Sequence, residues 1–113
     1  MTNPDGKYGR ENVQIHQIES FKDCIMMKLK YSGTLDFRRA VRSCIPFAKE
    51  NGFDIDKNPQ RFYAKLFDEL SSLEHIGHVK IDKVEQDGRD RIERISLTDK
   101  GKEWFNENDF DIR

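Results

Sequence analysis

The chain has 113 residues, of which 35% are hydrophobic and 36% charged, and its formal net charge is −1. A chain of this length buries a single core, so we expect one domain. Because the charges nearly balance, a dominant basic field is excluded, and any affinity for nucleic acid must come from local clusters of lysine and arginine. The sequence contains no signal peptide and no apolar run long enough to span a bilayer, which predicts a cytoplasmic protein.

The two cysteines, Cys24 and Cys44, have neither metal-ligand nor redox spacing. Each lies on or beside an apolar stripe, which favours small core residues with free thiols. His75 and His78 span the end of a predicted helix, and this placement does not favour a metal site. We therefore expect neither a metal nor another cofactor.

The first helix is preceded by polar, turn-forming residues 1–10, which we expect to form a flexible N-terminal arm. Apolar residues at helical spacing predict a helix that starts at either Val13 or Ser20 and ends at Tyr31. A serine–glycine pair then stops it.

The second helix is predicted to begin after Asp36, acting as N-cap, and to end near Asn51. Pro46 lies inside this helix and predicts a kink or a break within residues 43–45, because proline lacks the N–H that the helix interior needs. The short stretch 34–35 before the helix can add a strand to the edge of a hairpin.

The third helix has Asn58 as N-cap and Pro59 at its first position. Its apolar stripe consists of Phe62, Leu66, Leu70, Leu73 and Ile76. The outward side chains of its first two turns are small, basic or hydrogen-bonding, and they are Gln60, Arg61, Ala64 and Lys65. Tyr63 and Phe67 lie at the margin of the stripe, where they belong either to the edge of the core or to a dimer contact.

Residues 79–97 alternate in the manner of a hairpin. A three-residue loop over 87–89 gives every apolar and charged residue a matching partner. The pairs are Val79 with Leu97, Ile81 with Ile95, Val84 with Ile92, Asp82 with Arg94, Lys83 with Glu93 and Glu85 with Arg91. A two-residue loop would instead set Ile81 against Arg94 and Asp82 against Glu93. We therefore predict the longer loop, with Gly88 at positive φ.

This register leaves Arg89 at the loop tip with no partner required across the hairpin. Arg89 is therefore the residue of the hairpin that we expect to contact nucleic acid, with smaller contributions from Lys80 and Lys83. A last helix is predicted from the N-cap Thr98 to Asn106, with Trp104 and Phe105 packing inward and a frayed tail over 107–113.

Two short motifs flank the hairpin: Leu73-Glu74-x-x-Gly77-x-Val79 before it and Leu97-Thr98-x-x-Gly101 after it. With three preceding helices, they make residues 20–105 resemble the winged helix-turn-helix superfamily, particularly small prokaryotic and archaeal regulators of the MarR and PadR kind. The resemblance implies an α+β domain over 11–106, with a three-helix core, a two- or three-stranded hairpin wing and a C-terminal helix. It also implies duplex DNA binding, with the third helix in the major groove and the wing on the backbone, and commonly a homodimer.

Our functional hypothesis is therefore a DNA-binding transcription regulator that is not an enzyme, since the chain carries no hydrolase pattern and no glycine-rich phosphate loop. The expected DNA-binding residues are Gln60, Arg61, Ala64, Lys65, Lys80, Lys83 and Arg89. The alternative is a winged helix that serves as a protein-interaction module in a transcription or replication assembly. The near-zero net charge favours this alternative, and the polar and basic start of the third helix favours DNA.

Overall fold

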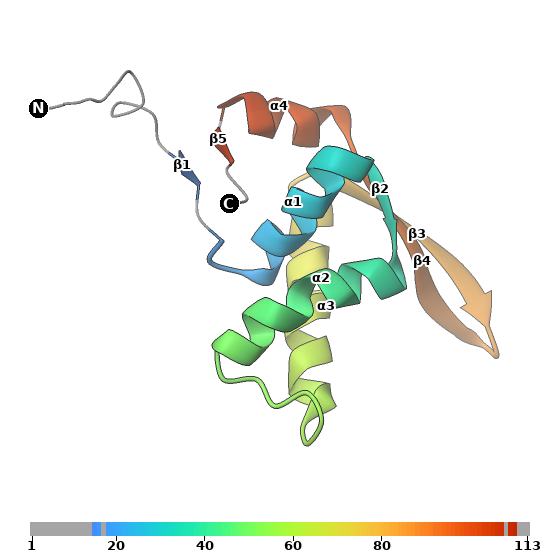
Figure 1. Ribbon diagram of the computed structural model, residues 1–113. Helices are drawn as coiled ribbons and strands as arrows, with labels where there is room; N and C mark the ends of the chain where they lie inside the picture. The colour runs from blue at the N-terminus through green and yellow to red at the C-terminus, as the bar shows by residue number, and fades with distance from the viewer. Residues whose placement is uncertain (1–14, 17, 108, 111–113) are drawn as a thin grey trace, which may run out of the picture.

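The computed structural model describes residues 15–16, 18–107 and 109–110, which form an α+β domain with four helices and a three-stranded antiparallel sheet (Figure 1). In chain order the elements are β1 (Ile15–His16), α1 (Phe21–Ser32), β2 (Thr34–Asp36), α2 (Phe37–Glu50), α3 (Pro59–His75), β3 (Val79–Gln86), β4 (Arg89–Leu97), α4 (Asp99–Glu107) and β5 (Asp109–Phe110). The order of helices, strand and hairpin is compatible with the expected layout.

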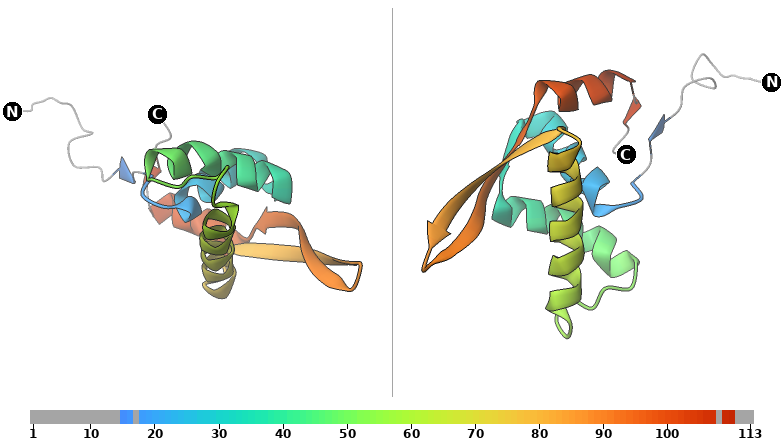
Figure 2. Two further views of the ribbon diagram at one scale, coloured as in Figure 1. Left: turned by 90° about the horizontal axis from the view of Figure 1, so that it is seen from below. Right: turned by 180° about the vertical axis from the view of Figure 1, so that it is seen from behind.

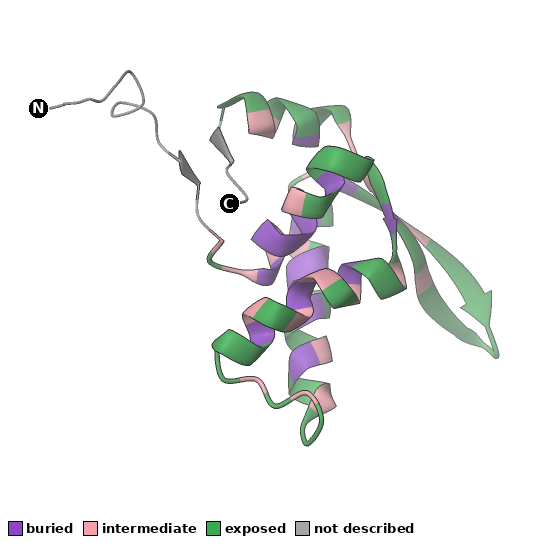
Figure 3. Cartoon of the chain, in the orientation of Figure 1, coloured by how far each residue is buried: buried purple, intermediate pink, exposed green. Residues whose placement is uncertain are grey.

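The core lies between α1, α2, α3 and the base of the sheet (Figure 3). Its largest fully buried side chains are Phe21, Ile25, Leu29, Cys44, Phe62, Leu66, Leu70 and Ile95. The ring of Phe21 lies 5.7 Å from that of Phe47 and 5.4 Å from those of Phe53 and Phe62, which joins α1, α2, α3 and the loop between the last two. The predicted apolar stripe of α3 is buried from Phe62 to Leu73, whereas Ile76, just past the helix, is exposed.

Helix α1 begins at Phe21, where the Ser20 hydroxyl accepts a hydrogen bond from the Asp23 N–H (3.3 Å). The shorter of the two predicted helices is therefore correct. Residues upstream form strand β1, which pairs in parallel with β5 in the segment expected to fray. Val13 and the predicted arm over 1–10 lie outside the described residues.

Helix α2 is capped by Asp36 as predicted, with the carboxylate accepting from the Arg39 N–H at 2.8 Å. Helix α2 is continuous from Phe37 to Glu50, so the chain does not break near Pro46. Pro46 is exposed, so solvent can serve the single carbonyl that loses its donor. Cys44 and Ala48 on the other side are fully buried and hold both halves of α2 against the core.

The sheet has the strand order β2-β4-β3, so the stretch before α2 does add a strand to the hairpin edge. One row across it, Leu35, Ile95 and Ile81, faces the helices, with the first two residues buried and the third half-buried. The predicted pairs Val79 with Leu97 and Ile81 with Ile95 are confirmed.

The hairpin of β3 and β4, residues 79–97, is called the wing below, and its outer half departs from the predicted register. Asp87 (φ 55°) and Gly88 (φ 77°) form a two-residue turn with positive φ at both positions, and Arg89 pairs with Gln86 as the first residue of β4. The three-residue loop is therefore wrong, and so is the expected position of Arg89 at its tip.

A β-bulge between Asp82 and Lys83 reconciles the two halves of the wing. One extra residue on β4, Glu93, is left out of the pairing, so that Lys83 faces Ile92 and Val84 faces Arg91. The predicted pairs beyond the bulge (Lys83 with Glu93, Val84 with Ile92, Glu85 with Arg91) do not form. The bulge keeps the apolar pairs near the core and allows a turn whose twist matches that of the strands.

The two motifs that flank the wing meet at its base. The Thr98 hydroxyl donates to the Gly77 carbonyl (2.5 Å) and accepts from the Gly101 N–H (3.0 Å), while the Thr98 N–H bonds the His78 carbonyl (3.1 Å). Gly101 is buried against the His78 backbone. This junction ties the start of α4 to the end of α3 and thereby sets where the wing leaves the domain.

Candidate nucleic-acid interface

The outward face of α3 and the wing lie on the side of the molecule away from α1 and α2 (Figure 2). From behind, α3 and the wing diverge from the junction near Gly77, and the wing extends beyond the helical body. The four predicted residues of α3, which are Gln60, Arg61, Ala64 and Lys65, are all exposed. The predicted site residues thus lie on two separate elements, α3 and the wing.

Arg61 has a structural role that the sequence did not reveal. Its Nη1 donates to the Gly52 carbonyl (3.3 Å), and its guanidinium carbon lies 4.3 Å from the centroid of the Phe53 ring. Since the ring of Phe53 also packs on Phe21, the cation–π contact fastens the loop between α2 and α3 to the core.

Lys65 is also engaged within the molecule. Its ammonium lies 3.4 Å from a carboxylate oxygen of Glu69, whose side chain is only 8% exposed. The other Glu69 oxygen accepts from the Lys22 backbone N–H on α1 at 2.8 Å. The Glu69 carboxylate joins α3 to α1, and Lys65 neutralises its charge. A nearly buried carboxylate requires such a partner.

Gln60 and Ala64 remain as the uncommitted outward residues of the first two turns. Both are exposed, and within the described part of the chain the Gln60 side chain forms no hydrogen bond. Asn58 is the N-cap of α3, as predicted, and its side chain accepts a hydrogen bond from the Arg61 N–H (3.4 Å).

The wing cations are all exposed. Lys80 lies 3.8 Å from Asp82 on the same strand. Arg94 lies opposite Asp82, as predicted, but forms no ion pair with it. Lys83 and Arg89 form no ion pair with the residues that the structure describes. Both side chains remain available to a binding partner. Arg89 lies beside the turn, at the start of β4, and not at its tip.

Formal charge is distributed unevenly along the chain. Residues 21–50, which contain α1 and α2, carry seven Lys and Arg against three Asp and Glu, a net charge of +4. Residues 51–113, which contain α3 and the wing, carry eleven against fifteen, a net charge of −4. Counting charges by segment would have revealed this asymmetry, which the whole-chain value conceals.

An aromatic row lies along α3 at the margin of its buried stripe. Phe67 is 43% exposed and stacks on Phe37 with the ring centroids 5.6 Å apart, while Tyr63 is half-buried and lies 6.3 Å from Phe67. Tyr63 thus belongs to the edge of the core, whereas Phe67 leaves a large part of its ring uncovered.

Cys24 and Cys44 are buried and free, as predicted. A hydrogen bond to Cys24, together with burial, raises the pKa of the Cys44 thiol. No group of three or more His, Cys, Asp or Glu side chains gathers in a metal-binding arrangement among the residues described. Within the same residues, none of the helices is long and apolar enough to cross a membrane.

Comparison of the chain with protein-family models, with curated proteins and with solved structures finds no match.

Proposed function

We propose that the protein is a winged helix-turn-helix transcription regulator that binds duplex DNA through the outward face of α3 and the wing. The observation that carries the proposal is the joint exposure of these two elements on one side of the domain, beyond the packing of the core (Figures 2 and 3). A helix fits the major groove, and a two-stranded ribbon beside it can follow the phosphate backbone.

In this proposal the residues of α3 have different roles, according to whether their side chains are free to contact DNA. Gln60 and Ala64 face the base edges, because their side chains are exposed and uncommitted. Arg61 adds positive charge near the helix N-terminus from a position held by Phe53, whereas the charge of Lys65 is balanced by Glu69. Lys80, Lys83 and Arg89 supply sequence-independent contacts to phosphates, the first sharing its charge with Asp82.

Replacement of Ala64 by Glu tests the helix directly. The change places a carboxylate at the centre of the proposed interface without altering a buried contact, so we expect duplex affinity to fall by at least about tenfold. The matched control, Asn106→Glu, makes the same charge change at an exposed position of α4 and should bind as the unaltered protein does. Equal affinities for Ala64→Glu and Asn106→Glu, measured by fluorescence anisotropy with fragments of genomic duplex, would contradict the proposal.

A protein-interaction module is the second candidate, and two observations favour it. Residues 51–113 are net negative, and Phe67 exposes part of an aromatic ring beside the same face. Under this alternative, the unaltered protein and Ala64→Glu bind duplex equally weakly, whereas Phe67→Ser weakens binding of a protein partner.

We further propose a homodimer, as is common in the superfamily that the sequence resembles. Phe67 on α3 is 43% exposed and Ile76 just past it is 40% exposed, so large apolar side chains remain on the surface of one chain. Light scattering at about tens of micromolar, a range in which weak dimers populate, should give twice the chain mass of 13.4 kDa. A mass equal to that of one chain would reject the dimer.

A further inference from the structure

A second polar surface lies between α1 and α2 and involves neither α3 nor the wing. A cavity of about 470 Å³ is lined by residues of α1, β2 and α2, among them Lys28, Tyr31, Leu35, Arg39 and Arg42. Its volume falls within the range of small-molecule sites. We call it the α1–α2 cavity.

The lining of this cavity carries three cations and no acid. Lys28 and Arg42 form no ion pair with any residue that the structure describes. Arg39 lies 3.9 Å from Asp36, and this pair is largely exposed, so it is weak and easily exchanged for another anion. The cavity therefore carries an excess of positive charge, because Lys28 and Arg42 have no carboxylate partner among the described residues and Arg39 is only weakly paired with Asp36. This excess favours an anionic ligand.

Tyr31 and Leu35 give the cavity a second chemical character. Tyr31 is 67% exposed, the most exposed of the large hydrophobic side chains in the described part, while Leu35 is buried. An exposed phenol ring next to a cluster of cations offers a stacking face for a flat ring. The cavity thus combines charged groups for an anion with an aromatic surface for a ring.

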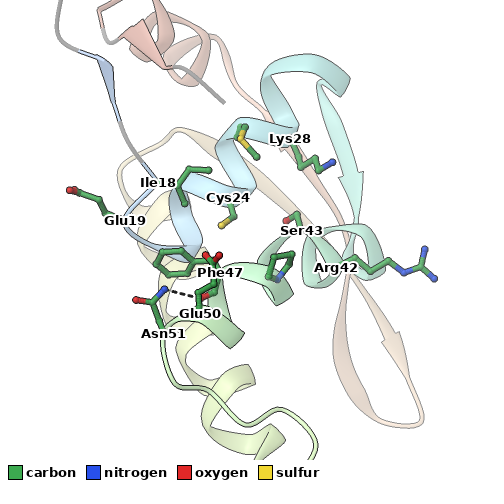
Figure 4. A pocket seen from close by; sticks show the side chains of 11 residues that line it. Ile18, Glu19, Cys24, Lys28, Arg42, Ser43, Phe47, Glu50 and Asn51 are labelled. Atoms are coloured by element: carbon green, nitrogen blue, oxygen red, sulfur yellow. Dashed lines mark hydrogen bonds between the residues drawn. The ribbon is translucent and has the colours of Figure 1, made fainter. Parts of the chain in front are cut away.

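A larger cavity of about 760 Å³ adjoins the first and shares Lys28, Arg42 and Ser43 with it (Figure 4). In Figure 4 the side chains of Lys28 and Arg42 project from α1 and α2 on the same side. The far end of the larger cavity is lined by Glu19 and Glu50, which disfavour an anion there. The charges therefore direct a phosphate to the shared end, beside Tyr31.

We propose that the α1–α2 cavity binds a small phosphorylated ligand that carries a flat ring, of the nucleotide class. Its phosphates lie against Lys28, Arg39 and Arg42, and its ring stacks on Tyr31. A hollow lined from two helices and a strand suits a small molecule better than the convex backbone of a duplex. This assignment does not depend on DNA binding by α3, because none of the residues that carry it belongs to α3 or the wing.

Amide chemical shifts of the full chain can test the proposal with adenosine 5′-diphosphate, inorganic pyrophosphate and adenosine as probes. The diphosphate should perturb residues 28–43 and leave α3 and the wing unchanged, pyrophosphate should perturb the same cationic residues, and adenosine should have little effect. Arg42→Ala should weaken the diphosphate by about tenfold, as expected for loss of a charged hydrogen bond. Lys49→Ala removes one charge from the same helix outside the cavity and should leave binding unchanged.

Tyr31→Ala separates ring recognition from charge attraction. It should weaken adenosine 5′-diphosphate and leave pyrophosphate unaffected, whereas an equal effect on both would overturn the assignment of a ring-bearing ligand. At about 5 mM diphosphate, even a site with a binding free energy of only about 3 kcal/mol is half filled. Absence of chemical-shift changes at that concentration would overturn the proposal as a whole. So would perturbation of residues 28–43 by duplex DNA with no response to the diphosphate.

Discussion

Gly101 occupies the tightest position at the base of the wing. A Cβ built at this residue would overlap the His78 carbonyl oxygen and lie 2.7 Å from Cδ1 of Leu97. Because the first of these neighbours is backbone, it cannot move without shifting the start of the wing. The glycine of the Leu97-Thr98-x-x-Gly101 motif is thus required by close approach and not by an unusual backbone angle.

Replacement of Gly101 by alanine should therefore lower the free energy of unfolding by at least about 2 kcal/mol, as overpacking against a rigid neighbour does. Urea denaturation followed by circular dichroism measures it. Lys102→Ala, at the adjacent exposed position of α4, is the control and should change stability little. A Gly101→Ala protein within about 0.5 kcal/mol of the unaltered one would refute the packing described for this junction.

His78 makes stability depend on pH. Partial burial lowers its pKa, and the nearby Lys100 lowers it further against a smaller opposing effect of Glu107. The unfolded chain then binds the proton more tightly than the folded chain, so the free energy of unfolding falls as the pH drops through the ordinary histidine pKa of about 6.5. The effect is modest, because the ring retains solvent contact.

Unfolding measured between about pH 7.5 and pH 5.5, the interval in which histidine titrates, should show this loss. His78→Gln should reduce the pH dependence, whereas His75→Gln, at an exposed position where α3 ends, should retain it. If both variants kept the dependence of the unaltered protein, the shift would not arise at His78.

Individual side chains show where sequence reasoning succeeded and failed. The N-caps Asp36 and Asn58 were predicted correctly, because capping depends on residues three positions apart, whereas the sequence left the start of α1 open between Val13 and Ser20. The internal contacts of Arg61 and Lys65 were not, since they depend on how the loop after α2 folds back and on which carboxylate of α3 becomes buried. Periodicity assigns a residue to the outer face of a helix and does not identify its neighbours.

At the scale of elements, the wing illustrates a conflict between two local preferences. Matching of side chains favours a three-residue loop, whereas Asp87-Gly88 favours a two-residue turn with both φ values positive. The bulge at Glu93 changes the register midway along the strands, so side-chain matching is kept near the core and given up in the outer half, where the turn sets the register. A uniform register cannot predict this outcome, although each half of the wing follows one of the two registers that the sequence allows.

The corrected wing leads to a quantitative expectation for Arg89. Its guanidinium forms no ion pair within the described chain, so a phosphate contact should release about one counterion. Arg89→Ala should then weaken all duplex sequences alike and reduce the salt slope of binding by about one.

Lys102→Ala on α4 removes the same charge away from the wing and is the control for this experiment. If Arg89→Ala left the salt slope unchanged and Arg91→Ala reduced it, the contact to the DNA backbone would belong to Arg91 and the expectation for Arg89 would be wrong.

At the scale of the whole molecule, the two sides of the domain differ in charge. Residues 21–50, with α1 and α2, carry a net charge of +4, whereas residues 59–97, with α3 and the wing, carry seven Lys and Arg against eight Asp and Glu, a net charge of −1. Long-range attraction therefore directs phosphates toward α1 and α2, while shape and exposure favour a duplex at α3 and the wing. The two sides thus suit different ligands in our account, a small phosphorylated molecule on one and a duplex on the other.

Chemical-shift mapping of the full chain with a genomic duplex fragment tests the central claim most directly, because it identifies the face that the duplex touches. We predict that amide perturbations gather on the exposed residues of the first half of α3 and on the outer half of the wing, between Gln60 and Lys65 and between Lys83 and Arg91. Perturbations confined to residues 28–43, or none at a protein and duplex concentration of about 0.1 mM, where even non-specific complexes form, would contradict duplex binding by α3 and the wing.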